Sequence, residues 1–185
     1  SAVEQLKILP ALLEGYDQRR LLFYHTNSEI QGSIAKLRSS GILEEKPGNA
    51  YRAVILNTSG NKMDFYLRRS IEVKSISCRL RSTQINIILK NISNPDQKLP
   101  SYVAGRLDLG LKSGLKNSHG ISLLVYGPYG STVDQIITPS LGLDVAIGQE
   151  RGHPVAIIPL DISASDQEQI EVVFKGGVGK LTYID

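Results

Sequence analysis

Alternating apolar and polar residues dominate the chain from Tyr51 onward. Successive side chains of a β-strand point to opposite faces of a sheet, so this period of two predicts strands with one buried face. The pattern predicts about ten short strands separated by Gly, Pro, Asn and Ser, which is typical of an antiparallel β-sandwich. The expected strands are residues 51–57, 64–73, 76–80, 84–89, 103–112, 121–126, 141–147, 155–158, 170–174 and 181–184.

Residues 76–89 predict a β-hairpin with its turn at residues 81–83. On each of its strands every second side chain is apolar, and these side chains are expected to face the core. These side chains are Ile76, Cys78, Leu80, Ile85, Ile87 and Leu89. We therefore interpret Cys78 as a small buried hydrophobic residue and not as a reactive thiolate.

The first 48 residues carry a different pattern. Apolar residues at helical spacing predict a first helix, which Pro10 kinks. Residues 19–25 then predict a short strand. A second helix is expected to start at Ser28, where Gln31 completes a capping-box pattern, and to end at Gly41. The apolar residues of the first helix are Val3, Leu6, Leu9 and Leu13.

A chain of 185 residues suits one domain with a small appendage. We predict a mainly β protein, with a helix-strand-helix cap at residues 1–48 and an antiparallel, immunoglobulin-like β-sandwich at residues 49–185. The 21 basic and 18 acidic residues give a net charge of +3, and most basic residues are scattered. Because nucleic-acid binding requires clustered Lys and Arg, we expect no nucleic-acid partner.

Composition and spacing also disfavour several classes of site. The single cysteine forms neither an intrachain disulfide nor a multi-thiolate metal site. The three histidines lie in separate segments without partners at metal-ligand spacing, so we expect structural or surface roles for them and no metal. No G-x-S-x-G motif is present, and no apolar run approaches the roughly 20 residues that span a bilayer. We predict no cofactor and no catalytic residue.

The glycine-rich residues 175–180 are similar to part of a phosphate-binding loop. Leu181 follows Lys180, where such a loop has Ser or Thr, and the five residues that remain are too few for the helix that faces the phosphates. The segment therefore predicts a turn between two strands, and no nucleotide is expected to bind.

Two weaker signals concern carbohydrates. Asp64, Asp108 and Asp144 are candidates for the acid and base of a glycosidase, which needs two carboxylates at a defined separation. Tyr126 and Tyr129 bracket a Gly-Pro turn, where a ring at a loop tip is a candidate for stacking on a sugar. Packing of both rings over the end of the sandwich is the simpler interpretation.

Arg69 conflicts with the apolar parity of its expected strand. It shares this parity with Phe65, Leu67, Ile71 and Val73, so it is predicted to point into the sandwich. Because an unpaired guanidinium in a core is costly, we expect a partly buried Arg69 held by hydrogen bonds where sandwich and cap meet. A β-bulge that turns it outward and a role as ligand anchor are the alternatives. The candidate ligand or structural anchors are Arg69, Asp64, Tyr66, Tyr126 and Tyr129.

Two stretches, "NTSGNKMDFYLRR" and "LPSYVAG", with "LKN" between them, are similar to the C-terminal part of the domain-of-unknown-function family 4012. In that family an Asn-x-Lys-x-Asp-x-Tyr-Leu-x-Arg-like strand, an asparagine that ends a later strand and a Leu-Pro-x-Tyr-Val-x-Gly-like turn occur in this order. The matching residues are Asn61, Lys62, Asp64, Tyr66, Leu67, Arg69, Asn91, Leu99, Pro100, Tyr102, Val103 and Gly105. Leu9-Pro10, Arg20 and Gln31 extend the similarity towards the N-terminus, and residues 125–130 match more loosely.

Members of this family look like envelope proteins of actinobacteria and related bacteria, anchored by an N-terminal membrane helix and facing outward. The resemblance implies that the chain is the C-terminal portion of such a protein, outside the cytoplasm, and that it meets the membrane only through a segment absent here. No activity is established for the family, so the resemblance supplies no catalytic residue.

Our leading hypothesis is a non-catalytic extracytoplasmic module for assembly or recognition of cell-wall or surface polymers. Its partner would be a polysaccharide or another envelope protein. The alternatives are a glycan-processing enzyme with carboxylates in a sandwich groove and a cytosolic protein-interaction domain. A deep cleft with two carboxylates would favour the enzyme, and a filled sandwich with shallow grooves would favour the module.

Overall fold

The computed structural model describes residues 2–17, 21–41, 49–77, 82–110, 117–139, 144–177 and 181–183. Contacts within the chain divide it into two compact units, residues 1–44 and residues 45–184.

The first unit contains three helices in its described residues: α1 (Ala2–Asp17), α2 (Ser28–Ile34) and the 3-10 helix η1 (Arg38–Ser40). Pro10 lies inside α1, as the sequence predicts. The apolar side chains described on α1 are exposed, and they are Ile8, Leu9, Leu12 and Leu13.

Three expectations for this unit are wrong. Residues 21–25 form no strand, because one backbone hydrogen bond, from Phe23 N–H to Ser39 O, makes no ladder, and the side chains of Leu22, Phe23 and Tyr24 are exposed. Asn27 rather than Ser28 caps α2, because its side-chain oxygen accepts hydrogen bonds from the first free backbone N–H groups of the helix. Helix α2 ends at Ile34, and Gly41, with φ of 68°, instead ends the 3-10 turn.

The second unit contains nine strands and two short helices in its described residues. The strands are β1 (Asn49–Asn57), β2 (Leu67–Ser77), β3 (Ser82–Asn91), β4 (His119–Tyr126), β5 (Ser131–Ile137), β6 (Ala146–Glu150), β7 (His153–Ile162), β8 (Gln167–Gly176) and β9 (Leu181–Tyr183). The helices are the 3-10 helix η2 (Met63–Tyr66) and α3 (Ser101–Ala104).

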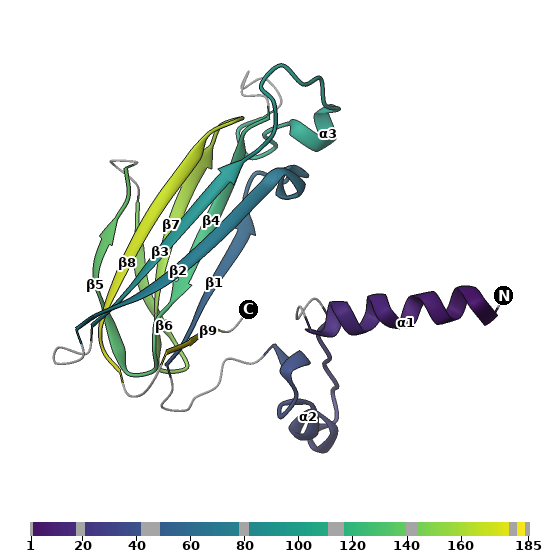
Figure 1. Ribbon diagram of the computed structural model, residues 1–185, viewed down its shortest axis with the longest axis vertical. Coiled ribbons are helices and arrows are strands. Elements are labelled where there is room, and N and C mark those ends of the chain that lie inside the picture. Colours follow the sequence, from purple (N-terminus) through teal and green to yellow (C-terminus); the bar gives the residue numbers. More distant parts are fainter. Residues whose placement is uncertain are drawn as a thin grey trace. The chain divides into compact units, whose positions relative to one another are not determined.

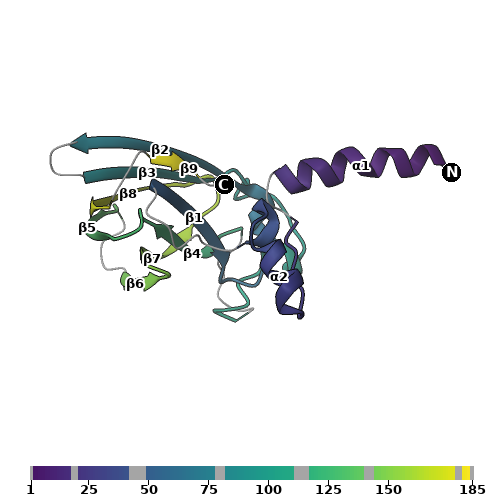
Figure 2. The same ribbon diagram turned by 90° about the horizontal axis from the view of Figure 1, so that it is seen from below.

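These strands form a five-stranded sheet in the order β6-β7-β4-β1-β9 and a four-stranded sheet in the order β2-β3-β8-β5 (Figures 1 and 2). Neighbouring strands are antiparallel, apart from β9, which pairs with β1 in parallel. The two sheets stack with their apolar faces together, so the predicted β-sandwich is confirmed.

The core lies between the sheets, and its apolar side chains alternate with polar ones along the strands, as the sequence predicts. Ile85, Ile87 and Leu89 of β3 are fully buried. They belong to one core cluster that also includes Ile121, Leu123, Val125, Ile158, Ile162, Ile170, Val172 and Phe174. Cys78 and Leu80, the other predicted core residues of this hairpin, lie outside the described residues, and the side chain of Ile76 is not described.

Two further expectations for the sandwich are wrong. Residues 103–110 form no strand: Pro100 precedes the single-turn helix α3, and bends follow at residues 107–109. Strand β2 begins only at Leu67, because residues 63–66 form η2. Strand β5 was not predicted, since a bulge between Val133 and Gln135 breaks its alternation.

The turn predicted at residues 175–180 lies partly outside the described residues, which omit residues 178–180. Strand β8 ends at Gly176 and β9 begins at Leu181. Gly176 and Gly177 have φ values of 84° and 83°, a conformation that glycine adopts without strain. The predicted strand residues 141–143 lie outside the described part of the chain.

We expect Ile87→Ala to lower the free energy of unfolding by about 2–5 kcal/mol, because truncation of a fully buried side chain loses transfer energy and leaves a cavity. Urea unfolding followed by circular dichroism measures this change. Ile137→Ala is the control, because Ile137 is 52% exposed on β5, and we expect it to change stability by less than about 0.5 kcal/mol. Equal effects of the two substitutions would contradict this assignment of the core.

Candidate functional site

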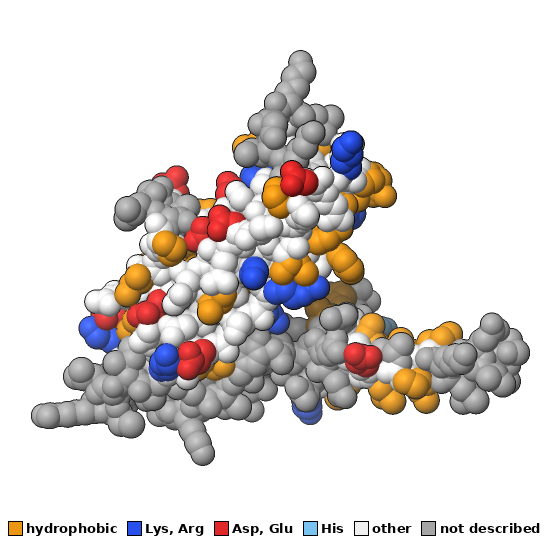
Figure 3. Space-filling model, turned by 45° about the horizontal axis from the view of Figure 1, so that its top comes forward, with side chains coloured by type: hydrophobic (Ala, Val, Ile, Leu, Met, Phe, Trp, Pro, Cys, Tyr) orange, Lys and Arg blue, Asp and Glu red, His pale blue; other side chains and the backbone are white. Residues whose placement is uncertain are grey.

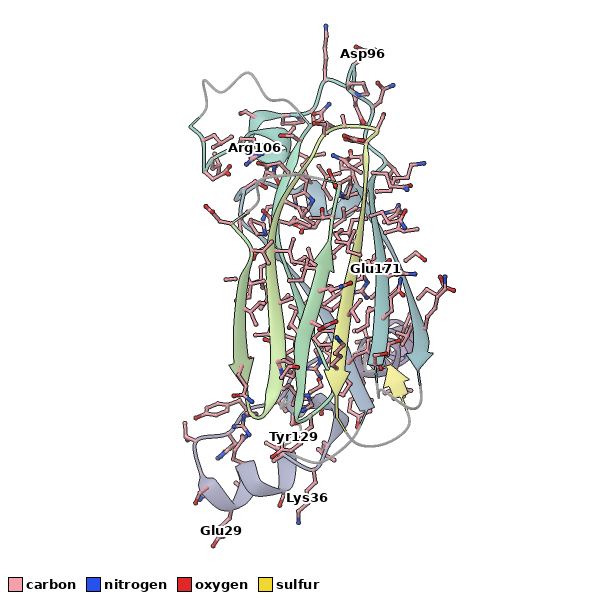
Figure 4. All side chains as sticks on the ribbon, turned by 90° about the vertical axis from the view of Figure 1, so that its left-hand side faces the viewer. Glu29, Lys36, Asp96, Arg106, Tyr129 and Glu171 are labelled. Carbon is pink, nitrogen blue, oxygen red and sulfur yellow. The ribbon has the colours of Figure 1, made fainter. Side chains whose placement is uncertain are left out.

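Buried polar side chains gather at the end of the sandwich next to α3, around residues 117–120, which lead into β4. Figure 4 places Arg106 at this end of the sandwich and Tyr129 at the opposite end. These buried side chains are Ser59, Asn61, Asn91, Ser93, Arg106, Asn117, Ser118 and His119. Buried polar groups are costly unless they are hydrogen-bonded, so their partners decide what this cluster does.

Two Asn-x-Ser sequences end one strand in each sheet with the same local geometry. At the end of β3, Ser93 Oγ–H donates to Asn91 Oδ1 (2.7 Å). At the end of β1, Ser59 Oγ lies 3.0 Å from the side-chain oxygen of Asn57. Such local hydrogen bonds favour turns over continued strands, which explains why both strands stop here.

Side-chain amides from these turns hold residues 117–120. Asn91 Nδ2–H donates to the carbonyl oxygens of Asn117 (2.8 Å) and Ile162 (3.1 Å). Asn61 Nδ2–H donates to the carbonyl oxygen of Ser118 (3.1 Å). Gly120 N–H donates to Ser59 Oγ (3.2 Å). Strands from both sheets are thereby tied to one short segment.

Arg106 adds a buried guanidinium to this cluster, with 3% of its side chain exposed. Its Nε and Nη2 donate to the two carboxylate oxygens of Asp108 (2.8 and 2.6 Å), and its Nη1 donates to Asp161. The hydrogen bond with Asp108 raises the pKa of Arg106 against the opposing effect of burial, and it lowers the pKa of Asp108. A Cβ atom on Gly120 would lie 2.7 Å from Nη2 of Arg106, so any other residue there would force the guanidinium to shift.

His119 is fully buried beside the carboxylate of Asp64. Its Nε2 lies 3.4 Å from Asp64 Oδ1, and neither ring nitrogen has a hydrogen-bond partner among the described residues. Burial lowers the pKa of His119, the nearby carboxylate of Asp64 opposes this shift, and the charge of Arg106 adds to it. Asp64 in turn accepts a hydrogen bond from Asn57 Nδ2 (2.6 Å). His119 is therefore held neutral near pH 7.

The carboxylates proposed for a glycosidase do not stand free at this end. Asp64 is bonded to Asn57 and approaches His119, and Asp108 is bonded to Arg106. Asp144 is exposed, two residues before β6. In the described part of the chain, no group of three His, Cys, Asp or Glu side chains is arranged to hold a metal ion.

Arg69 has the predicted orientation but not the predicted burial. Its Nη1–H donates to the carbonyl oxygen of Ala53 in β1 (3.4 Å), so the side chain points across the sandwich. It is nevertheless exposed, because β2 is an edge strand and its inward side chains face the open margin of the sandwich. The expectation of a partly buried Arg69 is wrong. Tyr66, on η2, is partly exposed, and its hydroxyl lies 3.5 Å from Gln97 Nε2.

Tyr126 and Tyr129 pack over the opposite end of the sandwich, as the simpler interpretation predicts. Tyr126 is buried and donates to Glu150 (2.8 Å), and burial together with this carboxylate raises its pKa to about 12. Tyr129 makes an edge-to-face contact with the buried ring of His153, with ring centroids 5.6 Å apart. A Cβ atom on Gly127 would lie 2.3 Å from the ring of Phe174, so glycine is required in this turn.

Exposed apolar side chains surround α3 at the Arg106 end, and the sequence did not single them out. Phe65 is 76% exposed and Tyr102 is 69% exposed. We call the loop-end surface the set of exposed residues Phe65, Ile92, Tyr102, Leu107 and Leu109. Figure 3 turns this end towards the viewer and shows hydrophobic side chains on it. The sequence signal for this surface was the presence of apolar residues in a stretch rich in Pro, Asp and Gly, and we interpreted that stretch as a strand.

The loops that carry the loop-end surface are joined by backbone hydrogen bonds. Lys62 N–H donates to Val103 O (2.9 Å), and Leu107 N–H donates to Ser59 O (3.0 Å). Ile92 N–H donates to the carbonyl oxygen of Tyr66 (2.9 Å). The exposed side chains therefore stand on a support that is ordered before any partner binds.

Comparisons with known proteins identify no relative. No protein-family model matches the chain, and neither the curated proteins nor the solved structures include a match. Within the described residues, no helix is both long and apolar enough to cross a membrane. By its structure the protein is a β-sandwich with a buried polar cluster and exposed apolar side chains at the same end.

We expect Asn91→Ala to lower the free energy of unfolding by about 1–3 kcal/mol, because the carbonyl oxygens of Asn117 and Ile162 each lose a buried hydrogen bond from its amide, and only the longer bond from Ser93 Oγ (3.3 Å) remains to Asn117. Chemical denaturation measures the change. Gln169→Ala on the exposed face of β8 is the control and should change stability by less than about 0.5 kcal/mol. A neutral result for Asn91→Ala would show that the amide does not hold residues 117–120 in place.

His119 should make stability depend on pH. Its pKa is below the ordinary value of 6.5 in the folded protein and close to 6.5 in the unfolded chain, so acid protonates the unfolded chain first. Stability should therefore fall as the pH drops below about 6.5, by at most about 1.4 kcal/mol per pH unit for this one group. The difference in unfolding free energy between wild type and His119→Gln, measured from pH 7.5 to 5, should change with pH. A constant difference would contradict the lowered pKa.

Proposed function

We propose that this chain is a non-catalytic module of a membrane-anchored envelope protein, located outside the cytoplasm, which takes part in assembly or recognition of cell-wall or surface polymers. The similarity of its "NTSGNKMDFYLRR" and "LPSYVAG" stretches to envelope proteins motivates the location and the anchor. The geometry of the Arg106 end motivates the non-catalytic role.

The polar groups of this end are engaged with one another. The charge of Arg106 is neutralised by Asp108 and Asp161. The side-chain amides of Asn61 and Asn91 donate to backbone carbonyl oxygens. A general acid or base must reach a substrate with a group that is free to exchange a proton. The bonded state of Asp64 and Asp108 therefore supports a structural role for the cluster and argues against the glycan-processing alternative.

The observation that carries the proposal is the pair of exposed aromatic rings, Phe65 and Tyr102, on hydrogen-bonded loops. Contiguous exposed apolar side chains on a soluble domain mark interaction surfaces, and aromatic residues are enriched in them. A support that is already ordered limits the entropy lost on binding. Flat rings suit the apolar faces of a sugar chain, and Gln97, whose side chain lies 3.5 Å from the hydroxyl of Tyr66, offers a polar group for sugar hydroxyls.

The test is binding to wall material. Wild-type protein should cosediment with insoluble actinobacterial cell walls or bind soluble wall polysaccharide, and release no new reducing ends. The double variant Phe65→Ala, Tyr102→Ala should bind at least about tenfold more weakly, the loss expected when central contact residues are truncated.

Ile147→Ala is the matched control, since Ile147 is 63% exposed on β6, and it should bind like wild type. Failure of the wild-type protein to bind any wall fraction, or undiminished binding by the double variant, would contradict the proposal. Release of reducing ends would support the enzyme instead.

A further inference from the structure

Among the described residues, no strand covers one long margin of the sandwich, apart from the short β9 on the edge of β1. Arg69 of β2 reaches Ala53 of β1, so β2 lies over β1, while β5 lies against β7 at the other margin. Strand β2 is the edge of the four-stranded sheet over its whole length, Leu67–Ser77. In the five-stranded sheet, β9 covers the outer side of β1 only at Asn49, Ala50 and Tyr51.

Beyond Tyr51, the outer side of β1 pairs with no strand among the described residues, although the carbonyl oxygen of Ala53 accepts the hydrogen bond from Arg69. Just after the end of β1, Thr58 N–H donates to Gly120 O of β4 (3.0 Å). Because backbone groups of successive strand residues point to alternate sides, the N–H and C=O groups of Ala53, Ile55 and Asn57 point away from β4. Among the described residues, no strand pairs with Ile55 or Asn57 on that side.

Apolar core side chains are incompletely covered along the same margin. Ile55 of β1 and Leu67, Ile71 and Val73 of β2 are only partly buried, although they pack against the main core cluster. Unpaired backbone groups beside half-covered apolar side chains form a template for an added strand. Such a strand would hydrogen-bond the backbone groups and cover the side chains.

Arg69 stands in this opening. Its inward direction, its exposure and its long hydrogen bond to Ala53 O place a positive charge between the two edges. An inward-pointing charge on an edge strand discourages indiscriminate strand addition. The same guanidinium would be neutralised by a carboxylate on an entering segment, which gives the edge a preference for acidic partners.

We propose that the outer edge of β1 between Ala53 and Asn57 is a docking site for an extended segment of a partner protein. The segment adds to the sheet parallel to β1, in the direction that β9 already takes. One of its inward side chains is a carboxylate that meets Arg69, and the others are apolar. This protein-binding edge is separate from the loop-end surface and does not depend on the proposed polymer binding.

The probe is a blocked heptapeptide, Val-Thr-Glu-Thr-Val-Thr-Val, with a fluorophore for anisotropy titration against the whole chain. We expect it to bind at least about tenfold more tightly than the same peptide with Lys in place of Glu, because the first makes and the second opposes a charged hydrogen bond. Arg69→Gln should abolish this preference. Arg68→Gln, on the outer face of β2, is the matched control and should keep it.

Hydrogen exchange locates the bound peptide. The amide of Ile55 should exchange more slowly when the Glu peptide is bound, and a peptide with Pro at the central Thr should bind poorly, because it disturbs strand pairing. Equal affinities of the Glu and Lys peptides for wild type, no binding at millimolar peptide, or unchanged exchange at Ile55 with peptide bound would each overturn the proposal.

Discussion

The hydrogen bonds that hold residues 117–120 are the interaction on which the arrangement of this protein depends. Asn91 comes from one sheet, Ser59 follows a strand of the other, and Asn61 lies in the loop between β1 and β2. All three side chains bond to the segment that starts β4. Because each is nearly fully buried, water cannot replace a lost partner, and the sheets are joined at this end by directional bonds as well as by apolar packing.

This polar cluster also explains why an apolar surface stands on top of it. Amides and the Arg106 ion pairs satisfy the backbone and charges beneath the loops, which leaves Phe65 and Tyr102 directed outward. The opposite end is closed differently, by Tyr126 and Tyr129 packed with His153 and Phe174. The surface we propose for polymers and the open edge we propose for a partner strand therefore lie on one scaffold but rest on different features, a satisfied loop cluster and an unpaired β1.

Much of the sandwich could be predicted from the sequence because its central strands have one buried and one polar face. Ile85, Ile87 and Leu89 alternate with polar residues or half-buried ones, and they are fully buried as expected. The same signal misled at residues 103–110, where Leu107 and Leu109 alternate with charged residues in a loop and remain exposed. Alternation reports the spacing of apolar residues but not whether a partner strand exists to pair with them. The predicted strand at residues 21–25 was wrong for the same reason.

The candidate site was less accessible from the sequence. Asp64, Arg69, Tyr126 and Tyr129 were singled out by residue type, and the structure distributes them over both ends and one margin of the sandwich. The residues that form the polar cluster, such as Ser59, Ser93 and Arg106, come from segments far apart in the chain. No spacing rule joins them, because antiparallel pairing of nonadjacent strands brings them together.

Local chemistry in the sequence thus determined the strands of the core, the positive φ angles of the two glycines at the end of β8 and the inward direction of Arg69, since each depends on neighbours along the chain. Tertiary structure alone decided the exposure of Arg69, the burial of His119 beside Asp64 and the free edge of β1. These properties depend on which strand lies at the edge of a sheet and which segments meet at its end. Such relations are set by packing across the whole sandwich, and no stretch of the sequence contains them.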